Sequence, residues 1–474
     1  MNFGGIGLGS YGQGILNGFG MGSMGEVEAL NKALNTGTGV SAGGTPTHSP
    51  LIVESLETSL KTLTYSEEHV KLWKKLAKLP AYSTVEEYNQ LASYGSDGGG
   101  FIAEGQLPAT EDSVYQRKHS FVKFLGTTRE ITHPMTLVRT AHGDIEAQES
   151  QNGILWILKK MEHALFWGDS SLAALGAEGI QFDGLNKMVQ NKIDLKGKEL
   201  TDVIVNSGAN MVIQNYGIVT DMYLPYQVLS TFSQSYFPKE RVIMPVDKSL
   251  QAGLVVNKFN TAGGTVEFQP DIFLQATPKM KTTSTGGNQA PTKPATLAVA
   301  ITSGTEPGEW AKVDVNGGQG TYKYWVTACN RYGESAPQPA TADLAMTTGD
   351  LGKAVKLTIT NESSMAVAPE WFNIYRSEID GTIGYQVMQV PATNITGGGT
   401  VEAYDSNEVI ANTYTAFMGE FSTEVIAFKQ LAPLMKMDLA IVGPVKRFMV
   451  LLYGTPQVYN PNKMMKFTNI KAMV

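Results

Sequence analysis

The stretch FWGDSSLAALGAEGIQFDGL, residues 166–185, contains the residue types that a nucleophilic enzyme uses. Within it, Ser170 follows a Gly-Asp pair and precedes a second serine. A serine acts as a nucleophile only when a base lies within hydrogen-bond reach and a third group orients that base. The catalytic hypothesis for Ser170 therefore depends on a histidine elsewhere in the chain.

The histidines do not fit that role. Hydrolases with a Gly-Asp-Ser block place the serine after a first strand and take the base from a late Asp-x-x-His pair, whereas Ser170 follows a predicted helix. All six histidines precede Ser170, and none has Asp three residues before it; they are His48, His69, His119, His133, His142 and His163. We therefore interpret the stretch as a turn at a helix end and predict no catalytic residue.

No metal or cofactor site is predicted. No two histidines lie three or four residues apart on a predicted helix, and the single cysteine, Cys329, excludes an intrachain disulfide and a cysteine-ligated zinc site. His163 interrupts an apolar helical region, which favours a core or interface position over a metal ligand. The glycines of GLGSYG, residues 7–12, have dinucleotide-loop spacing, but too few residues precede them to form the required strand.

The composition indicates a folded protein of several domains, because 474 residues exceed one ordinary core. The net charge of −7 and the pI near 5.5 argue against a dedicated nucleic-acid-binding protein. Charged residues make up only 17% of the chain, so subunit contacts are a candidate for covering its surface. We expect no membrane span and no secretory signal, because no apolar run reaches roughly 18 residues and no positive charge precedes Lys32.

The first part of the chain predicts an arm, a helical region and a polar ribbon. Residues 1–60 are rich in glycine and cannot bury enough surface to order themselves alone. Apolar spacing predicts helix from Pro50 to Leu79, where Pro80 ends it. The segment SVYQRKHSFVKFLGTTREIT, residues 113–132, is β-branched and aromatic with interleaved charges. This pattern predicts long strands that lie on another surface rather than in a core.

A long helix is predicted over residues 144–167, where apolar residues form one stripe. Asp144 is its expected N-cap. Glu146 and Glu149 are interpreted as charges at the favourable end of the helix dipole rather than as an acid–base pair. Gly168 follows at the C′ position, where a positive φ is expected.

The second part predicts an α+β body with an insert. Residues 185–280 alternate between helical and strand-like patterns, and a Pro/Gly/Thr-rich linker begins near residue 282. About seven short β-type runs follow and end near residue 412, which predicts a β-sandwich. From Ala416 the chain is predicted to turn helical and then strand-like in RFMVLLYG and MMKFTNI, so the sandwich is inserted within the body.

Aromatic residues of the insert support two hypotheses. Trp325, Trp371, Tyr375 and Tyr385 are interpreted as sandwich core, and a carbohydrate-binding platform is the alternative. The patterns Asn361-Glu-Ser363 and Asn394-Ile-Thr396 have glycosylation spacing, but no other feature of the sequence indicates secretion.

Four segments in order resemble the major capsid proteins of large contractile-tailed bacteriophages, which share the Hong Kong 97 fold. The first is the ribbon GGGFIAEGQLPATEDSVYQRKHSFVKFLGTTREIT, and the second is a long helix followed by WGD and then QFDGL. The third, FNIYRSEIDGTIGYQVMQVP, is similar to an inserted immunoglobulin-like or fibronectin-like domain of such proteins. The fourth is the tail, with LAPLMKMDLA and RFMVLLYGTPQVYNPNKMMKFTNIK.

The resemblance implies an α+β Hong Kong 97-type capsid fold with an N-terminal arm, an extended loop, a spine helix, peripheral and axial domains, and an inserted all-β immunoglobulin-like sandwich. The implied boundaries are 1–60 for the arm, 61–184 for the peripheral domain with the extended loop at about 81–140 and the spine helix at 144–167, 185–287 for the axial domain, 288–412 for the insert, and 413–474 for the return to the axial and peripheral domains.

The implied function is structural and not enzymatic. The chain is expected to form hexamers and pentamers of an icosahedral head shell that encloses phage DNA, assembled in the cytoplasm of the host bacterium and located in the virion. Expected partners are copies of itself, scaffold, portal and decoration proteins, and packaged double-stranded DNA in weak non-specific contact, with no membrane partner and no cofactor. The alternative hypothesis is a virion receptor- or carbohydrate-binding protein that acts through the insert.

Overall fold

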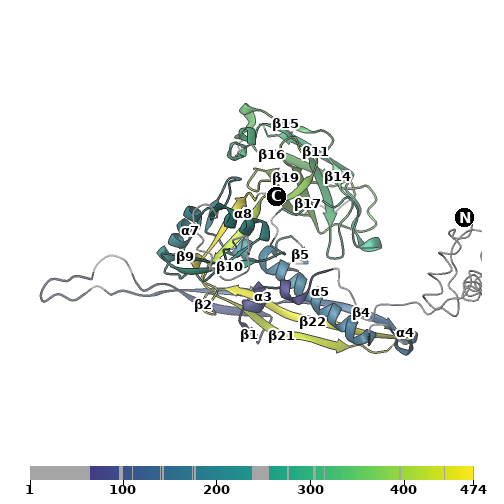
Figure 1. Ribbon diagram of the computed structural model, residues 1–474, viewed down its shortest axis with the longest axis horizontal. Helices are drawn as coiled ribbons and strands as arrows, with labels where there is room; N and C mark the ends of the chain where they lie inside the picture. The colour runs from purple at the N-terminus through teal and green to yellow at the C-terminus, as the bar shows by residue number, and fades with distance from the viewer. Residues whose placement is uncertain are drawn as a thin grey trace, which may run out of the picture. The chain divides into compact units, whose positions relative to one another are not determined.

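The computed structural model describes residues 64–472, apart from 96–99, 109, 139, 141–142, 173, 176–177, 237–255, 275–276, 303–305, 314, 394–396 and 442. The chain divides into two compact units, Met1–Leu63 with Val138–Ile145, and Thr64–Leu137 with Glu146–Val474. The elements described below lie in the second unit, apart from the first residue of the long helix (Figure 1). The predicted arm, the glycines of residues 7–12, His48, His142 and Asn394 lie outside the described residues.

The predicted polar ribbon forms a β-hairpin. Strand β2 (Val85–Ser93) pairs antiparallel with β3 (Val114–Phe121), and β4 (Lys123–Thr132) continues almost directly from β3. Most side chains of β3 are exposed, as the mixture of charged and aromatic residues predicts. In Figure 1 the hairpin projects from the sheet to which β4 belongs.

A four-stranded sheet joins the hairpin to the C-terminal part of the chain. Its order is β1 (Lys78–Pro80), β21 (Ile426–Asp438), β22 (Val445–Val458) and β4. The helical prediction after Ala416 is wrong, because this region forms the strand β20 (Tyr414–Gly419) and then β21. Register shifts after Gln430 and Ala432 interrupt the alternation of β21, so its apolar spacing does not follow a period of two.

The helix predicted over residues 144–167 is α5 (Ile145–Trp167). Near its start, Glu146 lies 2.6 Å from the Nζ atoms of both Lys436 and Lys446, on β21 and β22. Hydrogen bonds from these two lysines hold the pKa of Glu146 below its usual range. These ion pairs connect the N-terminal turns of α5 to the four-stranded sheet.

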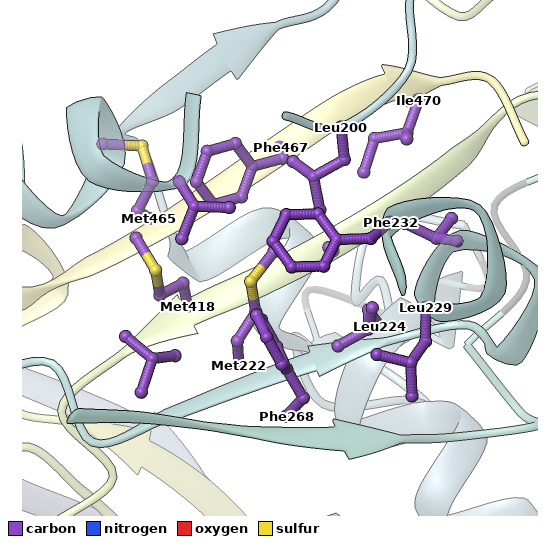
Figure 2. Packing of buried hydrophobic residues seen from close by; sticks show 14 of the residues in the cluster. Leu200, Met222, Leu224, Leu229, Phe232, Phe268, Met418, Met465, Phe467 and Ile470 are labelled. Atoms are coloured by element: carbon purple, nitrogen blue, oxygen red, sulfur yellow. The ribbon is translucent and has the colours of Figure 1, made fainter. Parts of the chain in front are cut away.

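A six-stranded sheet carries the largest apolar core of the body. Its order is β7 (Lys192–Asp194), β23 (Met464–Ile470), β20, β8 (Asp221–Leu224), β10 (Gly264–Pro270) and β9 (Lys258–Thr261). Helices α7 (Asp202–Gln214) and α8 (Tyr226–Tyr236) contribute buried residues to this core (Figure 2). The sequence predicted α7, α8, β8, β10 and β23.

The insert is a β-sandwich between β10 and β20. One sheet has the order β11 (Thr296–Ile301), β16 (Val355–Thr360), β19 (Thr400–Asp405), and the other β14 (Gln338–Pro339), β13 (Tyr324–Cys329), β17 (Trp371–Ser377), β18 (Gly384–Pro391). One buried core takes residues from both sheets. In the immunoglobulin order the first two strands are neighbours, whereas here the first strand, β11, pairs only with β16.

Short elements complete the described chain. They are α3 (Leu72–Lys75), α4 (His133–Leu137), α6 (Leu185–Met188), β5 (Ala174–Leu175), β6 (Glu178–Gly179), β12 (Gly320–Tyr322), β15 (Leu344–Met346) and the 3-10 turns Glu67–His69, Gly287–Gln289, Trp310–Lys312, Val315–Gly318, Thr348–Asp350 and Pro461–Lys463. The helix predicted from Pro50 to Leu79 is therefore shorter within the described residues, since only α3 and one 3-10 turn form there.

A buried carboxylate fixes the start of α3. Glu162 of α5 is fully buried and accepts hydrogen bonds from the backbone N–H groups of Lys71, Leu72 and Trp73 at 2.8, 2.6 and 2.8 Å. These are N–H groups that a helix start leaves without intrahelical partners. The four-residue helix is thus held by a tertiary contact rather than by its own propensity.

A second buried carboxyl faces Glu162. Burial and then the charge of Glu162 raise the pKa of Asp271 to about 8, and Lys71 lowers it by less. Asp271 accepts a hydrogen bond at Oδ1 from the Phe273 N–H, while its Oδ2 has no donor. The protonated Asp271 therefore donates to Glu162, whose oxygens already accept three N–H groups.

This pair predicts that stability falls as pH rises. Between about pH 4 and pH 8, Asp271 is ionised in the unfolded chain but protonated in the folded chain, so its contribution declines by up to about 1.4 kcal/mol per pH unit. Asp271→Asn keeps a neutral donor and should flatten this part of the profile. The measurement is the urea unfolding midpoint from pH 5 to pH 9. Asp343→Asn, on an exposed residue, is the matched control, and an unchanged profile in Asp271→Asn would contradict the assignment.

Candidate functional site

The C-terminal end of α5 contains Ser170 in a compact turn. The Gly168 N–H donates to Ala164 O at 2.8 Å, and the Gly184 N–H donates to Gly168 O at 2.8 Å. A Cβ atom on Gly168 would lie 2.4 Å from Phe182 O and 2.6 Å from Ala164 O. A Cβ atom on Gly184 would lie 2.7 Å from the Gly168 nitrogen. Two backbone segments therefore touch at a point where neither residue can carry a side chain.

The expected positive φ at Gly168 is wrong. Gly168 is not among the glycines with positive φ, so its backbone does not itself require glycine. The residue type is required instead by the close approach of residues 182–184. The sequence placed the helix end correctly but attributed the glycine to the wrong physical cause.

Lys187 gathers the polar groups of this turn. Its Nζ lies 2.6 Å from Asp169 Oδ1, 3.0 Å from Asp183 Oδ1 and 3.3 Å from Ser170 Oγ. Partial burial lowers the pKa of Lys187, but the hydrogen bonds to Asp169 and Asp183 outweigh this and raise the pKa above its ordinary value. Lys187 is therefore held charged and cannot remove a proton from Ser170.

Ser170 also lacks the histidine that catalysis needs. Its backbone N–H donates to Asp183 Oδ1 at 2.8 Å, which is a turn contact. His119 and Ser170 line the same groove, of about 1690 Å³, between the hairpin and residues 455–462, yet no hydrogen bond joins Ser170 to any histidine that the structure describes. The turn is structural, as the sequence predicted.

Lys187 was not singled out by sequence reasoning. The signal was available in the Asp183-to-Lys187 spacing of four residues, which brings two side chains together on a helical turn. The contact with Asp169 spans 18 residues and depends on the Gly168–Gly184 contact. That part was not readable from local spacing.

The other predicted site residues are dispersed. His69 bonds to Ser66 near the start of the described chain, His133 lies in α4, and His163 is exposed on α5, so the core position considered for His163 is wrong. Among the described residues, no three His, Cys, Asp or Glu side chains are arranged to hold a metal ion. No helix in the described part of the chain is long and apolar enough to cross a membrane.

The aromatic residues of the insert lie outside the sandwich core. Trp325, Trp371 and Tyr375 alternate with core residues of β13 and β17 and therefore face away from the core, and Tyr385 is buried beside it. The core interpretation is thus wrong for these four residues. Asn361, the first residue of one glycosylation pattern, is buried.

The polar groups of this outer face bond to one another. Glu334 Oε1 accepts hydrogen bonds from Thr327 Oγ1 and Tyr375 OH, each at 2.6 Å, and from Asn373 Nδ2 at 3.2 Å. A sugar platform requires polar groups that can bond to a ligand. The alternative function of the insert therefore gains no support from these groups.

These features define a structural subunit rather than an enzyme. A helix joined to two sheets, a projecting hairpin and an inserted sandwich are present, and the one serine with a catalytic sequence context is part of a turn. The relevant functional surface is then one that contacts other molecules, and the hairpin is its most exposed element.

Comparison with known proteins identifies the family. Residues 42–329, more than half of the chain, match the family described as SU10 major capsid protein. The putative major capsid protein of Enterococcus phage phiEF24C is 27% identical over 450 residues, covering 94% of this chain and 95% of that protein. The major capsid protein of Staphylococcus phage K is 26% identical over the same length with the same coverage. The chain belongs to the SU10 major capsid protein family.

Solved structures show weaker similarity. A chain from Gordonia phage Cozz has 11% identity and a TM-score of 0.46, covering 91% of this chain and 97% of that one. A chain from the capsid of Myoviridae phage XM1 has 7% identity and a TM-score of 0.43, covering 88% and 97%. The family match establishes the role: the protein is a non-enzymatic bacteriophage capsid subunit that forms the shell and is part of the virion.

The Gly168–Gly184 contact predicts a loss of stability on adding one carbon atom. Gly168→Ala and Gly184→Ala should each lower the free energy of unfolding by about 1–3 kcal/mol, because the new Cβ meets backbone atoms that cannot rotate away. Gly349→Ala is the matched control, because a Cβ there meets nothing within 4 Å. The check is urea unfolding of the unassembled subunit, and equal midpoints for all three variants would refute the clash.

Proposed function

We propose that this capsid subunit assembles into hexamers and pentamers of an icosahedral shell through its β2–β3 hairpin, which lies across a neighbouring copy as an extended loop. The observation that carries the proposal is the exposure of apolar side chains at the end of the hairpin. Tyr94 is 86% exposed, Phe101 103% and Leu107 93%. A soluble monomer gains nothing from exposing three large apolar side chains within one loop, whereas an assembled subunit buries them.

The family resemblance supports roles for the remaining parts. Helix α5 is proposed as the spine of the peripheral domain, with the four-stranded sheet, and the six-stranded sheet as the axial domain around capsomer centres. The arm of residues 1–60 is proposed to reach along the shell. The sandwich is proposed to project from the shell, where decoration proteins would have access to it.

Polar contacts at its base fix the sandwich to the body. Lys312 has only 6% of its side chain exposed and lies 3.0 Å from Asp194 Oδ2 of β7, and it also donates to Glu408 O at 2.9 Å. Asn469 of β23 donates to Asp194 Oδ1 at 2.8 Å and to Glu408 O at 2.9 Å. These contacts support a fixed insert rather than one on a free tether.

Contacts with scaffold, portal and packaged double-stranded DNA belong to the same proposal. The net charge of −7 supports weak, non-specific contact with DNA, because an acidic subunit is repelled by phosphates over most of its surface. Such weak contact is compatible with packing DNA of any sequence.

Proteolysis tests the proposed burial of the hairpin end. Chymotrypsin should cut the unassembled subunit at Tyr94 and Phe101, and the same bonds should be cut at least about tenfold more slowly in purified shells, because shell contacts exclude the protease. The fragments are identified by mass spectrometry, with shells dissociated in mild urea as the control. Equal cleavage rates in shells and free subunits would refute the proposed role of the hairpin.

A further inference from the structure

One face of α5 carries positive charge without a negative partner. Lys159 and Lys160 lie on the side of α5 away from its buried residues, and both side chains are exposed. Lys281, also exposed, is close enough to lower the pKa of Lys160. We call these three lysines the α5 basic patch. In the described part of the chain, none of the three forms an ion pair with a carboxylate.

Aromatic rings support the lysines of the patch. Lys159 Nζ lies 4.8 Å from the centre of the Tyr65 ring, and Lys160 Nζ lies 5.7 Å from the centre of the Trp156 ring. Both rings are half-buried, so the patch combines cations with accessible apolar surface. Such a surface fits a partner that carries both negative charge and apolar groups.

The electrostatics of the patch disfavour its being left uncovered. Desolvation first, and then the charges of Lys159 and Lys281, lower the pKa of Lys160, although part of its side chain remains accessible to solvent. The same two α5 lysines, after desolvation, lower the pKa of His163 to about 4, so His163 adds no charge at neutral pH. Every charge that acts on these two groups is positive, and an acidic partner would relieve the repulsion.

The end of the hairpin has the complementary composition. Residues 94–113, which we call the hairpin tip, contain four acidic residues and no lysine, arginine or histidine. Glu104 and Asp112 are exposed. The tip also carries the exposed side chains of Tyr94, Phe101 and Leu107. It therefore offers the combination of negative charge and apolar surface that fits the α5 basic patch.

The tip is placed to reach another copy rather than its own body. Contacts that hold the hairpin to the body are at its base, where Tyr88 OH donates to Val458 O at 3.1 Å and Gln457 Nε2 donates to Ser120 Oγ at 2.6 Å. From Tyr88 to the end of β2, five more residues extend the strand by about 17 Å at roughly 3.3 Å per residue. This length carries the tip away from the four-stranded sheet (Figure 1).

We infer that the hairpin tip of one subunit docks on the α5 basic patch of a neighbouring copy, with Glu104 and Asp112 facing Lys159, Lys160 and Lys281. The inference rests on the proposed function and names the receiving surface for the hairpin. A single exposed ion pair contributes only about 0.2–1 kcal/mol, but the contact repeats at every subunit of a closed shell. Charge reversal should therefore act strongly on assembly and weakly on the fold.

Three variants test the docking by charge reversal and rescue. Lys159→Glu/Lys160→Glu and Glu104→Lys/Asp112→Lys should each reduce the yield of closed shells at least about tenfold, measured by sedimentation velocity and electron microscopy. The chain that carries all four changes should recover assembly, because each tip then meets a complementary patch on its neighbour. Lys198→Glu/Lys293→Glu, which reverses two exposed lysines outside α5, is the control. Circular dichroism checks that every variant is folded.

The outcomes separate this inference from the proposed function. Absence of ordered oligomers in the unchanged chain would refute the proposed function itself. Assembly of the unchanged chain together with normal assembly of both reversal variants would refute only the docking. Loss of assembly in the lysine variant alone, without rescue by the four-residue combination, would also refute it and would assign the patch to another partner, such as the phosphates of packaged DNA.

Discussion

The close backbone contact between Gly168 and Gly184 is the constraint on which the architecture depends. It ends α5 and turns the chain back so that residues 182–184 lie against the last turn of the helix. The helix end is thereby held where Phe166 packs against Phe417 of the six-stranded sheet, with ring centres 5.8 Å apart. The other end of the helix is held to the four-stranded sheet by Glu146, so one helix sets the relation between two sheets.

Buried charge serves a second purpose in this molecule, which is to fix short segments that could not hold their own conformation. Glu162 orders the start of α3, Lys312 connects the insert to β7, and in the sandwich Arg376 lies 2.5 Å from Asp405 Oδ2 with its guanidinium over the Trp310 ring. Buried ion pairs add little net stability once desolvation is counted, but removing one partner is costly. We interpret these groups as devices that select one arrangement of thin elements.

The shell function follows from what the fold leaves exposed. The hairpin has few apolar residues to bury on its own body, and its end exposes acidic and aromatic side chains together. A subunit built in this way is incomplete alone, since part of its apolar surface is covered only by neighbours. Many weak and identical contacts then give a stable particle while each contact remains reversible during assembly.

The sequence by itself determined the elements whose patterns are local. Apolar spacing gave α5 within one residue, the boundaries of β17 and β23, the insertion of a sandwich, and the absence of a histidine after Ser170. It did not determine β21, because two register shifts break the alternation that marks a strand, and it placed Trp325 in a core that this residue faces away from. Only the tertiary structure decided the cause of Gly168 and the role of Lys187. Both depend on a contact between backbone segments that lie 16 residues apart in the chain, and no local pattern encodes how closely two such segments approach.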